Sequence, residues 1–260
     1  MSSLENLVLL RHGQSEGNLA HFHANEKNNT DYFTSEFRDK PGAMWHLTGE
    51  GREQAKIAGE WISDNILEGR FDAYFTSPLV RAVETAAYLD LTGARWSEPD
   101  PKLRERYWGD IEAMPFDEYQ QKYPDNAIRR NGDYLNWKPP GGESLAETIG
   151  RIEQFAVATT AAHPGQSVIA STHGEVMTGG RGYFEGVATG RRLASLKRRK
   201  FERIDNTSII WYTSRDPETE LATTALNWYR IANPVAKTDT GWRRIQRRRY
   251  SAEELLQLVK

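Results

Sequence analysis

The chain has 260 residues, of which 38% are hydrophobic and 27% charged, as is ordinary for one globular protein with a sizeable core. Its 34 lysine and arginine residues against 36 acidic ones give a formal net charge of −2, which argues against nucleic-acid binding over the whole surface. The absence of cysteine excludes disulfides, thiolate metal sites and a cysteine nucleophile.

The N-terminal region carries no sign of a targeting or membrane segment. No positively charged stretch precedes the short apolar run at residues 7–10, so a signal peptide is not expected. No stretch of the chain approaches the roughly 18 apolar residues of a membrane span. We therefore expect a soluble, cytoplasmic protein that does not interact with membranes.

Apolar runs typical of buried strands alternate along the chain with segments of helical spacing. The runs are residues 7–10, 72–76, 167–171, 207–212 and 223–231, and the helical segments are 51–66, 79–89 and 145–162. This alternation predicts a three-layer α/β/α fold with a mostly parallel central sheet. Residues 223–231 alternate more clearly and carry polar side chains, so an edge strand is expected there. Ser251 and Glu254 form a capping-box pattern that predicts a helix over about 252–259.

Two long segments interrupt this alternation of strands and helices. Residues 21–46 and 108–140 are polar and aromatic and show no clear period. Connections of this length in a compact domain are usually functional or disordered. We expect a single domain over residues 1–260, with insertions around 19–46 and 108–140 that form a lid around a site. His21 and His23 lie in the first insertion, where an exposed loop position is the simpler interpretation.

Candidate chemistry lies at three strand ends. Arg11-His12 follows the first apolar run, Arg81 lies one turn into the helix after the second, and His173-Gly174 follows the third. Functional sites in open α/β sheets gather at the carboxyl ends of strands, and helix N-termini there bind anions. A single histidine at a strand end is more often an ordinary polar residue than a functional one. Two separate strands that both end in His-Gly indicate a shared anion site.

These motifs resemble the signature of the histidine phosphatase superfamily, which includes the cofactor-dependent phosphoglycerate mutases and many phosphatases. Arg11-His12-Gly13-x-Ser15-x-x-Asn18 is similar to its leading motif. Four further segments resemble family motifs in the same order along the chain. They are the start of the first helix at 47–55, the second-arginine motif at 77–86, the acid motif at 103–109 and the second-histidine motif at 172–174. The motifs follow the family order over most of the chain. The resemblance implies the fold of that family and phosphoryl transfer to a histidine.

The resemblance also implies a role for individual residues. His12 would attack the phosphorus, Arg11 and Arg81 would neutralise the phosphoryl oxygens, and Glu105 would act as general acid and base. His173 would contact the same phosphoryl group. The rest of the phosphate pocket is expected from Ser15, Asn18 and Gly174. The positive charges come from side chains and no ligand cluster has metal spacing, so we expect neither a metal nor another cofactor.

The choice of Glu105 rests on the resemblance alone. Asp110 and Glu112 lie close to it in the sequence, and the residue types do not distinguish the three. A carboxyl group beside a phosphate dianion experiences like-charge repulsion, which favours its protonated form.

The sequence carries features of both phosphatases and mutases. Residues 105–109 are similar to a segment of phosphoglycerate mutases, and Arg106, Arg129 and Arg130 are the candidates for contacts with the rest of the substrate. The Arg129-Arg130 pair resembles the adjacent arginines that bind a carboxylate in mutases. Residues 139–144, Pro-Pro-Gly-Gly-Glu-Ser, instead resemble the phosphatase branch.

We therefore expect a phosphomonoester hydrolase that acts on a phosphorylated small molecule. A mutase, which would need 2,3-bisphosphoglycerate as cofactor, is the alternative, and a non-catalytic phosphate-binding protein is the second alternative. Basic residues at 191–203 and 243–249 are expected to form a solvated face. They could also steer a phosphorylated substrate or form the interface of a homo-oligomer. Gly179 and Gly180, each about 1 kcal/mol worse than alanine in a helix, predict a short, bent or interrupted helix after Glu175.

Overall fold

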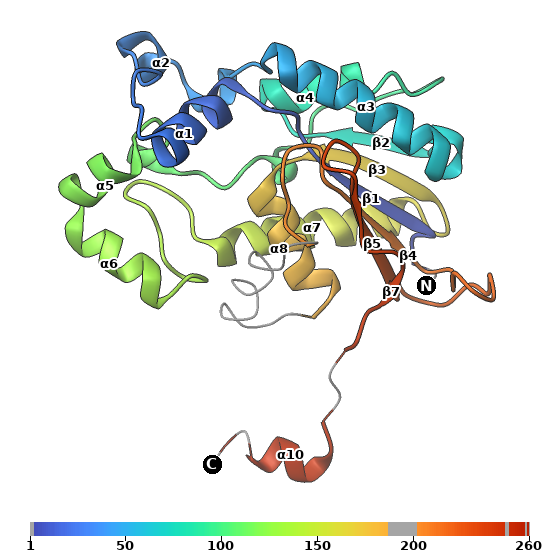
Figure 1. Ribbon diagram of the computed structural model, residues 1–260. Helices are drawn as coiled ribbons and strands as arrows, with labels where there is room; N and C mark the ends of the chain where they lie inside the picture. Colours follow the sequence, from blue (N-terminus) through green and yellow to red (C-terminus); the bar gives the residue numbers. More distant parts are fainter. Residues whose placement is uncertain (1–2, 187–201, 248–249, 258, 260) are drawn as a thin grey trace.

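The computed structural model describes residues 3–186, 202–247, 250–257 and 259. Within these residues the strands form a seven-stranded sheet in the order β2-β3-β1-β4-β5-β6, and β7 also pairs with β5 (Figure 1). The strands are β1 Asn6–Arg11, β2 Ala73–Thr76, β3 Ser167–Thr172, β4 Ile209–Thr213, β5 Trp228–Asn233, β6 Thr238–Asp239 and β7 Arg243–Arg244.

Most of the long strands share one direction. Strands β1 and β2 both run parallel to β3, while β4 is antiparallel to β1 and β5 is antiparallel to β4. Strands β1, β2, β3 and β5 therefore point the same way, and β4 is reversed. The predicted three-layer fold with a mostly parallel sheet is confirmed.

The prediction of an edge strand at 223–231 is wrong. Strand β5 begins at Trp228, and β6 and β7 pair with it on the side away from β4. The polar residues before it form a loop, in which the Thr223 hydroxyl donates to the carbonyl of Ser214 and accepts from the Asn227 amide. Part of the alternation of apolar and polar residues that suggested an edge strand therefore lies in this loop and not in β5.

Helices cover both faces of the sheet (Figure 1). They are α1 Glu16–Lys27, α2 Ser35–Asp39, α3 Gly49–Asn65, α4 Val80–Tyr88, α5 Phe116–Lys122, α6 Pro124–Gly132, α7 Leu145–Ala162, α8 Gly174–Phe184 and α10 Ala252–Gln257. Short 3₁₀ turns occupy η1 Gly42–Met44, η2 Leu67–Gly69, η3 Pro101–Leu103 and η4 Gly109–Ile111.

Strand β1 connects the two halves of the core because its side chains alternate between the two faces. Leu7 and Leu9 belong to a cluster that includes Ile152 of α7 and Val176 of α8. Val8, together with Leu10, belongs to a second cluster that includes Ala58 and Ile62 of α3. All four of these leucine and valine side chains are fully buried. The carboxyl end of β1 is thereby fixed between the two helical layers.

Of the short, bent or interrupted helix predicted after Glu175, the interruption is wrong, since α8 runs unbroken from Gly174 to Phe184. A Cβ atom added at Gly179 would lie 3.3 Å from Cγ1 of Ile149, and one at Gly180 would lie 3.3 Å from Cδ1 of Leu9. The two glycines therefore allow α8 to pack closely on α7 and β1. Tertiary packing outweighs their low helix propensity.

The two inserted segments lie together beyond the carboxyl end of β1 (Figure 1). The first contains most of α1, all of α2 and η1, and the second contains η4, α5 and α6. Arg38 donates to both carboxylate oxygens of Glu118 at 3.1 and 2.7 Å. His21 Nε2 lies 3.0 Å from the carbonyl of Glu112. These contacts join the two insertions to each other.

The C-terminal capping box is confirmed. Ser251 N donates to Oε2 of Glu254 at 2.8 Å, and Glu254 N donates to the Ser251 hydroxyl at 3.2 Å. Helix α10 follows as Ala252–Gln257. Of the basic stretches, residues 191–201 and 248–249 lie outside the described residues. Arg203 pairs with Asp205 at 2.7 Å, and Arg243 pairs with Glu202.

Candidate active site

A cavity of about 450 Å³ lies at the carboxyl end of β1, between the sheet and the two inserted segments. Pockets for small ligands commonly have volumes of this order. Most of the predicted site residues line it, namely Arg11, His12, Ser15, Asn18, Arg81, Glu105, Arg130 and Gly174. His173 lies directly beside it, with its ring centroid 5.0 Å from that of His12. The residues come from distant parts of the chain, so the fold assembles one site.

The imidazole of His12 is held in one tautomer. Its Nδ1 lies 2.7 Å from the carbonyl oxygen of Gly13, and since a carbonyl only accepts, Nδ1 carries the hydrogen. The lone pair is then on Nε2, which accepts a hydrogen bond from Nε of Arg81 at 3.1 Å. The nitrogen next to the Arg81 guanidinium is therefore unprotonated, as a nucleophile requires.

The backbone at Gly13 has no room for a side chain. A Cβ atom there would lie 2.2 Å from the carbonyl oxygen of Gly51 at the start of α3. The Gly13 N–H donates to the Thr85 hydroxyl in α4 at 3.0 Å. Close approach to α3 and this bond to α4 fix the turn that presents His12.

The pKa of His12 is lowered well below the usual histidine range. Burial is the main cause, and the charges of Arg81 and Arg11 add to it, while the bond to Gly13 opposes it. His12 is therefore neutral at physiological pH and is available to attack an electrophile.

Two arginines flank this imidazole. Arg11 donates to the carbonyl of Ile204 at 2.8 Å, and its buried Nε has no hydrogen-bond partner in the described structure. Arg81 donates from one terminal nitrogen to the carbonyl of Gly42 at 2.7 Å. Burial lowers the pKa of Arg81 to about 10, which leaves it charged at neutral pH. Together they supply two fixed cations and one unsatisfied donor, a suitable environment for an oxyanion.

His173 ends β3 and occupies the cap position before α8. Its Nε2 lies 2.7 Å from the Ser77 hydroxyl, while Nδ1 is buried and has no partner among the described residues. Burial, followed by the charge of Arg81, lowers its pKa well below the usual range. Ser77 thus orients His173, a role that the sequence did not assign.

Ser15 and Asn18 form a reciprocal capping box at the start of α1. The side-chain oxygen of Asn18 accepts from the Ser15 N–H at 3.1 Å and from the amide of Asn206 at 3.0 Å. This orientation leaves the NH₂ group of Asn18 as a donor for a ligand. Asn206 also donates to the carbonyl of His12 at 3.0 Å. Nothing in the sequence distinguished Asn206, because it precedes a strand with no motif around it.

The structure brings two of the three candidate acids into the cavity. Glu105 and Glu112 line it, whereas Asp110 is exposed and accepts a hydrogen bond from the Tyr123 hydroxyl at 3.2 Å. Burial raises the pKa of Glu105, and the charge of Glu175 raises it further, against the effect of Arg81. Burial also raises the pKa of Glu112. Both carboxyl groups are thus shifted towards the protonated form that a general acid requires.

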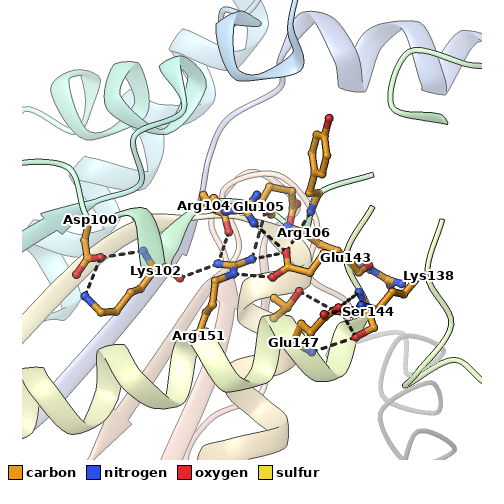
Figure 2. A network of polar contacts seen from close by, with 12 residues as sticks. Asp100, Lys102, Arg104, Glu105, Arg106, Lys138, Glu143, Ser144, Glu147 and Arg151 are labelled. Atoms are coloured by element: carbon orange, nitrogen blue, oxygen red, sulfur yellow. Dashed lines mark hydrogen bonds and ion pairs between the residues drawn. The ribbon is translucent and has the colours of Figure 1, made fainter. Parts of the chain in front are cut away.

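The segment that carries Glu105 is held by a network around Arg151 and Glu143 (Figure 2). Arg151 binds both carboxylate oxygens of Glu143 at 2.7 and 2.8 Å. It also donates to the carbonyls of Lys102 and Arg104 at 2.9 and 3.0 Å. Glu143 belongs to the Gly-Gly-Glu-Ser turn before α7. The turn therefore fixes the backbone on which Glu105 sits.

Two of the three arginines expected to bind substrate do not line the cavity. Arg106 is almost fully buried, and it donates to the carbonyls of Glu143 and Trp137, both at 2.8 Å. Its guanidinium is therefore part of the core of the second insertion. Arg129 is exposed on α6 and lies outside the cavity wall. The sequence placed it beside Arg130, but neighbouring residues of a helix point in different directions.

Arg130 and His21 do line the cavity. The Arg130 guanidinium lies over the rings of Phe116, Tyr119 and Trp137, at 5.3 to 6.0 Å from their centroids. The exposed-loop interpretation is wrong for His21, which is part of helix α1 and packs edge-on against Phe33.

Comparison with known proteins places the chain in a family. The family model for the histidine phosphatase superfamily (branch 1) matches residues 7–226. The chain belongs to this superfamily, whose members are enzymes, and the predicted resemblance is confirmed.

Named relatives include both mutases and phosphatases. The 2,3-bisphosphoglycerate-dependent phosphoglycerate mutase of Brucella anthropi is 34% identical over 65% of this chain and 75% of its own. The corresponding mutase of Methylorubrum populi is 31% identical over 74% of this chain and 84% of its own. A mycobacterial glucosyl-3-phosphoglycerate phosphatase, solved with VO₃, shares the fold at 22% identity and a TM-score of 0.62, over 80% of this chain and 92% of its own. The alpha-ribazole phosphatase of Shigella flexneri also shares the fold. It is 21% identical, with a TM-score of 0.62, over 85% of this chain and 95% of its own.

In the part of the chain that the structure describes, no group of three or more histidine, aspartate or glutamate side chains is arranged to hold a metal ion. Among the same residues, no helix has the length and apolar character needed to cross a membrane.

Proposed function

We propose that the protein is a phosphomonoester hydrolase that works through a phosphohistidine on Nε2 of His12. The observation that carries this proposal is the state of that nitrogen. The Gly13 carbonyl fixes the hydrogen on Nδ1, so Nε2 has a free lone pair next to two arginines in a cavity. A neutral imidazole between fixed cations is suited to attack the phosphorus of a bound phosphate ester.

The first step transfers the phosphoryl group to the enzyme. Nε2 of His12 forms a bond to phosphorus while the bond from phosphorus to the ester oxygen breaks, and the carboxyl group of Glu105 protonates that oxygen. Before this step, Arg81 exchanges its hydrogen bond to Nε2 for one to a phosphoryl oxygen. The unpartnered Nε of Arg11 and the NH₂ group of Asn18 supply further donors to the phosphoryl oxygens.

The second step returns the enzyme to its starting state. Glu105, now a carboxylate, takes a proton from a water molecule as the water oxygen attacks phosphorus. The bond from phosphorus to Nε2 breaks and phosphate is released. The raised pKa of Glu105 supports its role as the acid of the first step. The positive charges in this scheme belong to Arg11 and Arg81, so we propose that the reaction needs neither a metal nor another cofactor.

A mutase is the second candidate, and the names of the relatives at 31–35% identity favour it. A mutase would retain the phosphoryl group on His12 and return it to a second oxygen of the substrate. Two of the three arginines that resemble substrate-binding residues of mutases lie outside the cavity wall, namely Arg106 and Arg129. This loss of contacts supports hydrolysis over re-binding of a phosphorylated product.

Phosphate release from a panel of phosphomonoesters, with EDTA present, tests the proposal. The panel includes 3-phosphoglycerate with and without 2,3-bisphosphoglycerate. We expect release that a His12→Ala variant abolishes and that a His163→Ala variant retains, since His163 lies outside the cavity wall and bonds to Gln166. Isomerisation of 3-phosphoglycerate without net release would identify a mutase instead. Phosphate binding without turnover would identify a binding protein.

A further inference from the structure

The second inserted segment gives one part of the cavity wall an apolar, aromatic surface. Its side chains on this wall are Trp108, Ile111, Met114, Phe116 and Tyr119. Ile111, Met114 and Tyr119 are buried members of a small hydrophobic cluster that also contains Trp137. The insertion therefore has a core of its own, and one side of that core faces the cavity. Phosphate and its arginines make no use of such a surface.

Charged side chains of both signs line the described part of the cavity wall. Among the described lining residues, the positive ones are Arg11, Arg81, Arg130, Arg181 and Arg203, and the negative ones are Glu105, Glu112, Glu175, Glu202 and Asp205. Arg181 binds Glu185 and Glu202, and Arg203 binds Asp205. With Glu105 protonated, as its role as an acid requires, at most four of these carboxyl groups are charged. A bound phosphate dianion then leaves no excess of positive charge among the described lining residues, so a second anionic group on the same substrate would be uncompensated there.

Arg130 adds a flat surface to the apolar wall. Its guanidinium lies 5.4 Å from the ring centroid of Phe116, 6.0 Å from that of Tyr119 and 5.3 Å from that of Trp137. Contacts of this kind orient a guanidinium by its face, which also stacks well on a further aromatic ring. Trp45 of the first insertion lines the same cavity and provides another aromatic side chain.

We propose that the leaving group of the natural substrate is an uncharged aromatic alcohol, bound against Trp108, Met114 and Phe116. This inference rests on the proposed hydrolysis of a phosphomonoester and names the substrate class for it. The phosphoryl group lies between Arg11 and Arg81, and the alcohol extends onto the wall that the second insertion supplies. Burial of the aromatic ring there contributes to binding through the hydrophobic effect.

Binding of phosphonates, which cannot be hydrolysed, tests the subsite without turnover. Calorimetry would compare benzylphosphonate, ethylphosphonate and 4-carboxybenzylphosphonate on the full chain. We expect benzylphosphonate to bind at least about tenfold more tightly than ethylphosphonate. We also expect the added carboxylate to weaken binding. No preference for the benzyl compound, no binding, or tighter binding of the carboxylate would overturn the inference.

A pair of phenylalanine variants locates the preference. Phe116 is 43% exposed, so Phe116→Ala should leave the fold intact while it removes part of the apolar wall. Its ratio of benzyl to ethyl affinity should fall about three- to fivefold. Phe22 is 48% exposed on the first insertion and lies outside the cavity wall. Phe22→Ala should keep the wild-type ratio. An equal fall in both variants would contradict the placement of the ring.

Turnover of benzyl and ethyl phosphate separates this inference from the proposed function. Both esters have primary alcohols as leaving groups. A difference in kcat/KM between them therefore reports mainly on contacts of the alcohol with the apolar wall. Hydrolysis of both with equal kcat/KM would support the proposed function and overturn the inference. Preferential binding of benzylphosphonate without hydrolysis of benzyl phosphate would support the subsite and overturn the proposed function.

Discussion

Arg81 donates a hydrogen bond from Nε to Nε2 of His12 at 3.1 Å, and the same guanidinium donates to the carbonyl of Gly42 at 2.7 Å. Gly42 belongs to the first insertion, so Arg81 links that insertion to the imidazole. Its guanidinium is fixed by these two bonds before any ligand arrives. A cation held this close to the imidazole can bind a phosphoryl oxygen once its bond to Nε2 is exchanged.

Replacement of Arg81 by lysine should therefore impair catalysis although the charge is kept. A lysine offers one ammonium group and cannot reproduce the two bonds of the guanidinium fork. We expect Arg81→Lys to lower kcat/KM by about 10²–10³-fold in a phosphate-release assay. Arg95→Lys, at an exposed position outside the cavity, should match the wild type. Near-normal activity of Arg81→Lys would mean that catalysis does not need the two hydrogen bonds of the Arg81 guanidinium.

Removal of one carboxyl group at a time should identify the general acid. We expect Glu105→Gln to lower kcat about 10²–10⁴-fold for alkyl phosphates, whose leaving oxygen needs a proton. For p-nitrophenyl phosphate, whose leaving group departs without one, the same variant should lose far less. Glu112→Gln should show no such dependence on the leaving group. The opposite pattern would assign the acid to Glu112, which shares the cavity.

Glu175 should contribute to the pH dependence of the reaction. Burial is the larger cause of the raised pKa of Glu105, and the charge of Glu175 raises that pKa further. Glu105 must be protonated to act as an acid. In Glu175→Gln the pKa of Glu105 should fall, because the like-charge repulsion is gone. The alkaline limb of the kcat–pH profile, which reports loss of that proton, should then move to lower pH. An unchanged alkaline limb would mean that the charge of Glu175 does not affect the pKa of the general acid.

Asn206 should act as a positioning residue through Asn18 and His12. Asn206→Asp replaces the donating amide by a carboxylate that faces two oxygen acceptors, the His12 carbonyl and the Asn18 side chain. We expect kcat/KM to fall by about tenfold or more while the melting temperature changes little. Asn136→Asp on the exposed surface is the matched control. Loss of activity that only parallels loss of stability would indicate a structural role instead.

Two helical glycines should respond in opposite ways to alanine. A Cβ atom at Gly59 in α3 would lie 1.9 Å from the carbonyl oxygen of Leu89, whereas one at Gly150 in α7 has nothing within 4 Å. We expect Gly59→Ala to destabilise the protein by about 1–3 kcal/mol or more through overpacking. Gly150→Ala should stabilise it by up to about 1 kcal/mol. Urea unfolding of both variants measures the difference, and equal effects would contradict it.

The sequence predicted the parts of the site that follow directly from strand ends. His12 and His173 each come after an apolar run, and parallel pairing of those runs in β1 and β3 necessarily brings them together. Apolar runs locate these strand ends, and sites in open α/β sheets gather there. The same reasoning predicted the three layers of the fold.

Long-range packing decided what the sequence did not predict. The glycines of α8 were expected to weaken a helix, because their close contacts with Ile149 and Leu9 depend on distant residues. Arg106 was expected at the substrate, yet two main-chain carbonyls from another part of the chain bind its guanidinium. Asn206 reaches His12 across most of the sequence length, and no local pattern marks such a contact.

Trapping of the phosphorylated enzyme tests the central claim most directly. Mixing the protein with a hydrolysable phosphomonoester, quenching rapidly in base and mapping the modified peptide would locate the phosphoryl group, since phosphohistidine survives base and is lost in acid. We predict one phosphoryl group on His12, on the nitrogen that Arg81 contacts, and none in His12→Ala. Turnover with no phosphoenzyme at any quench time, or a phosphoryl group on another residue, would contradict it.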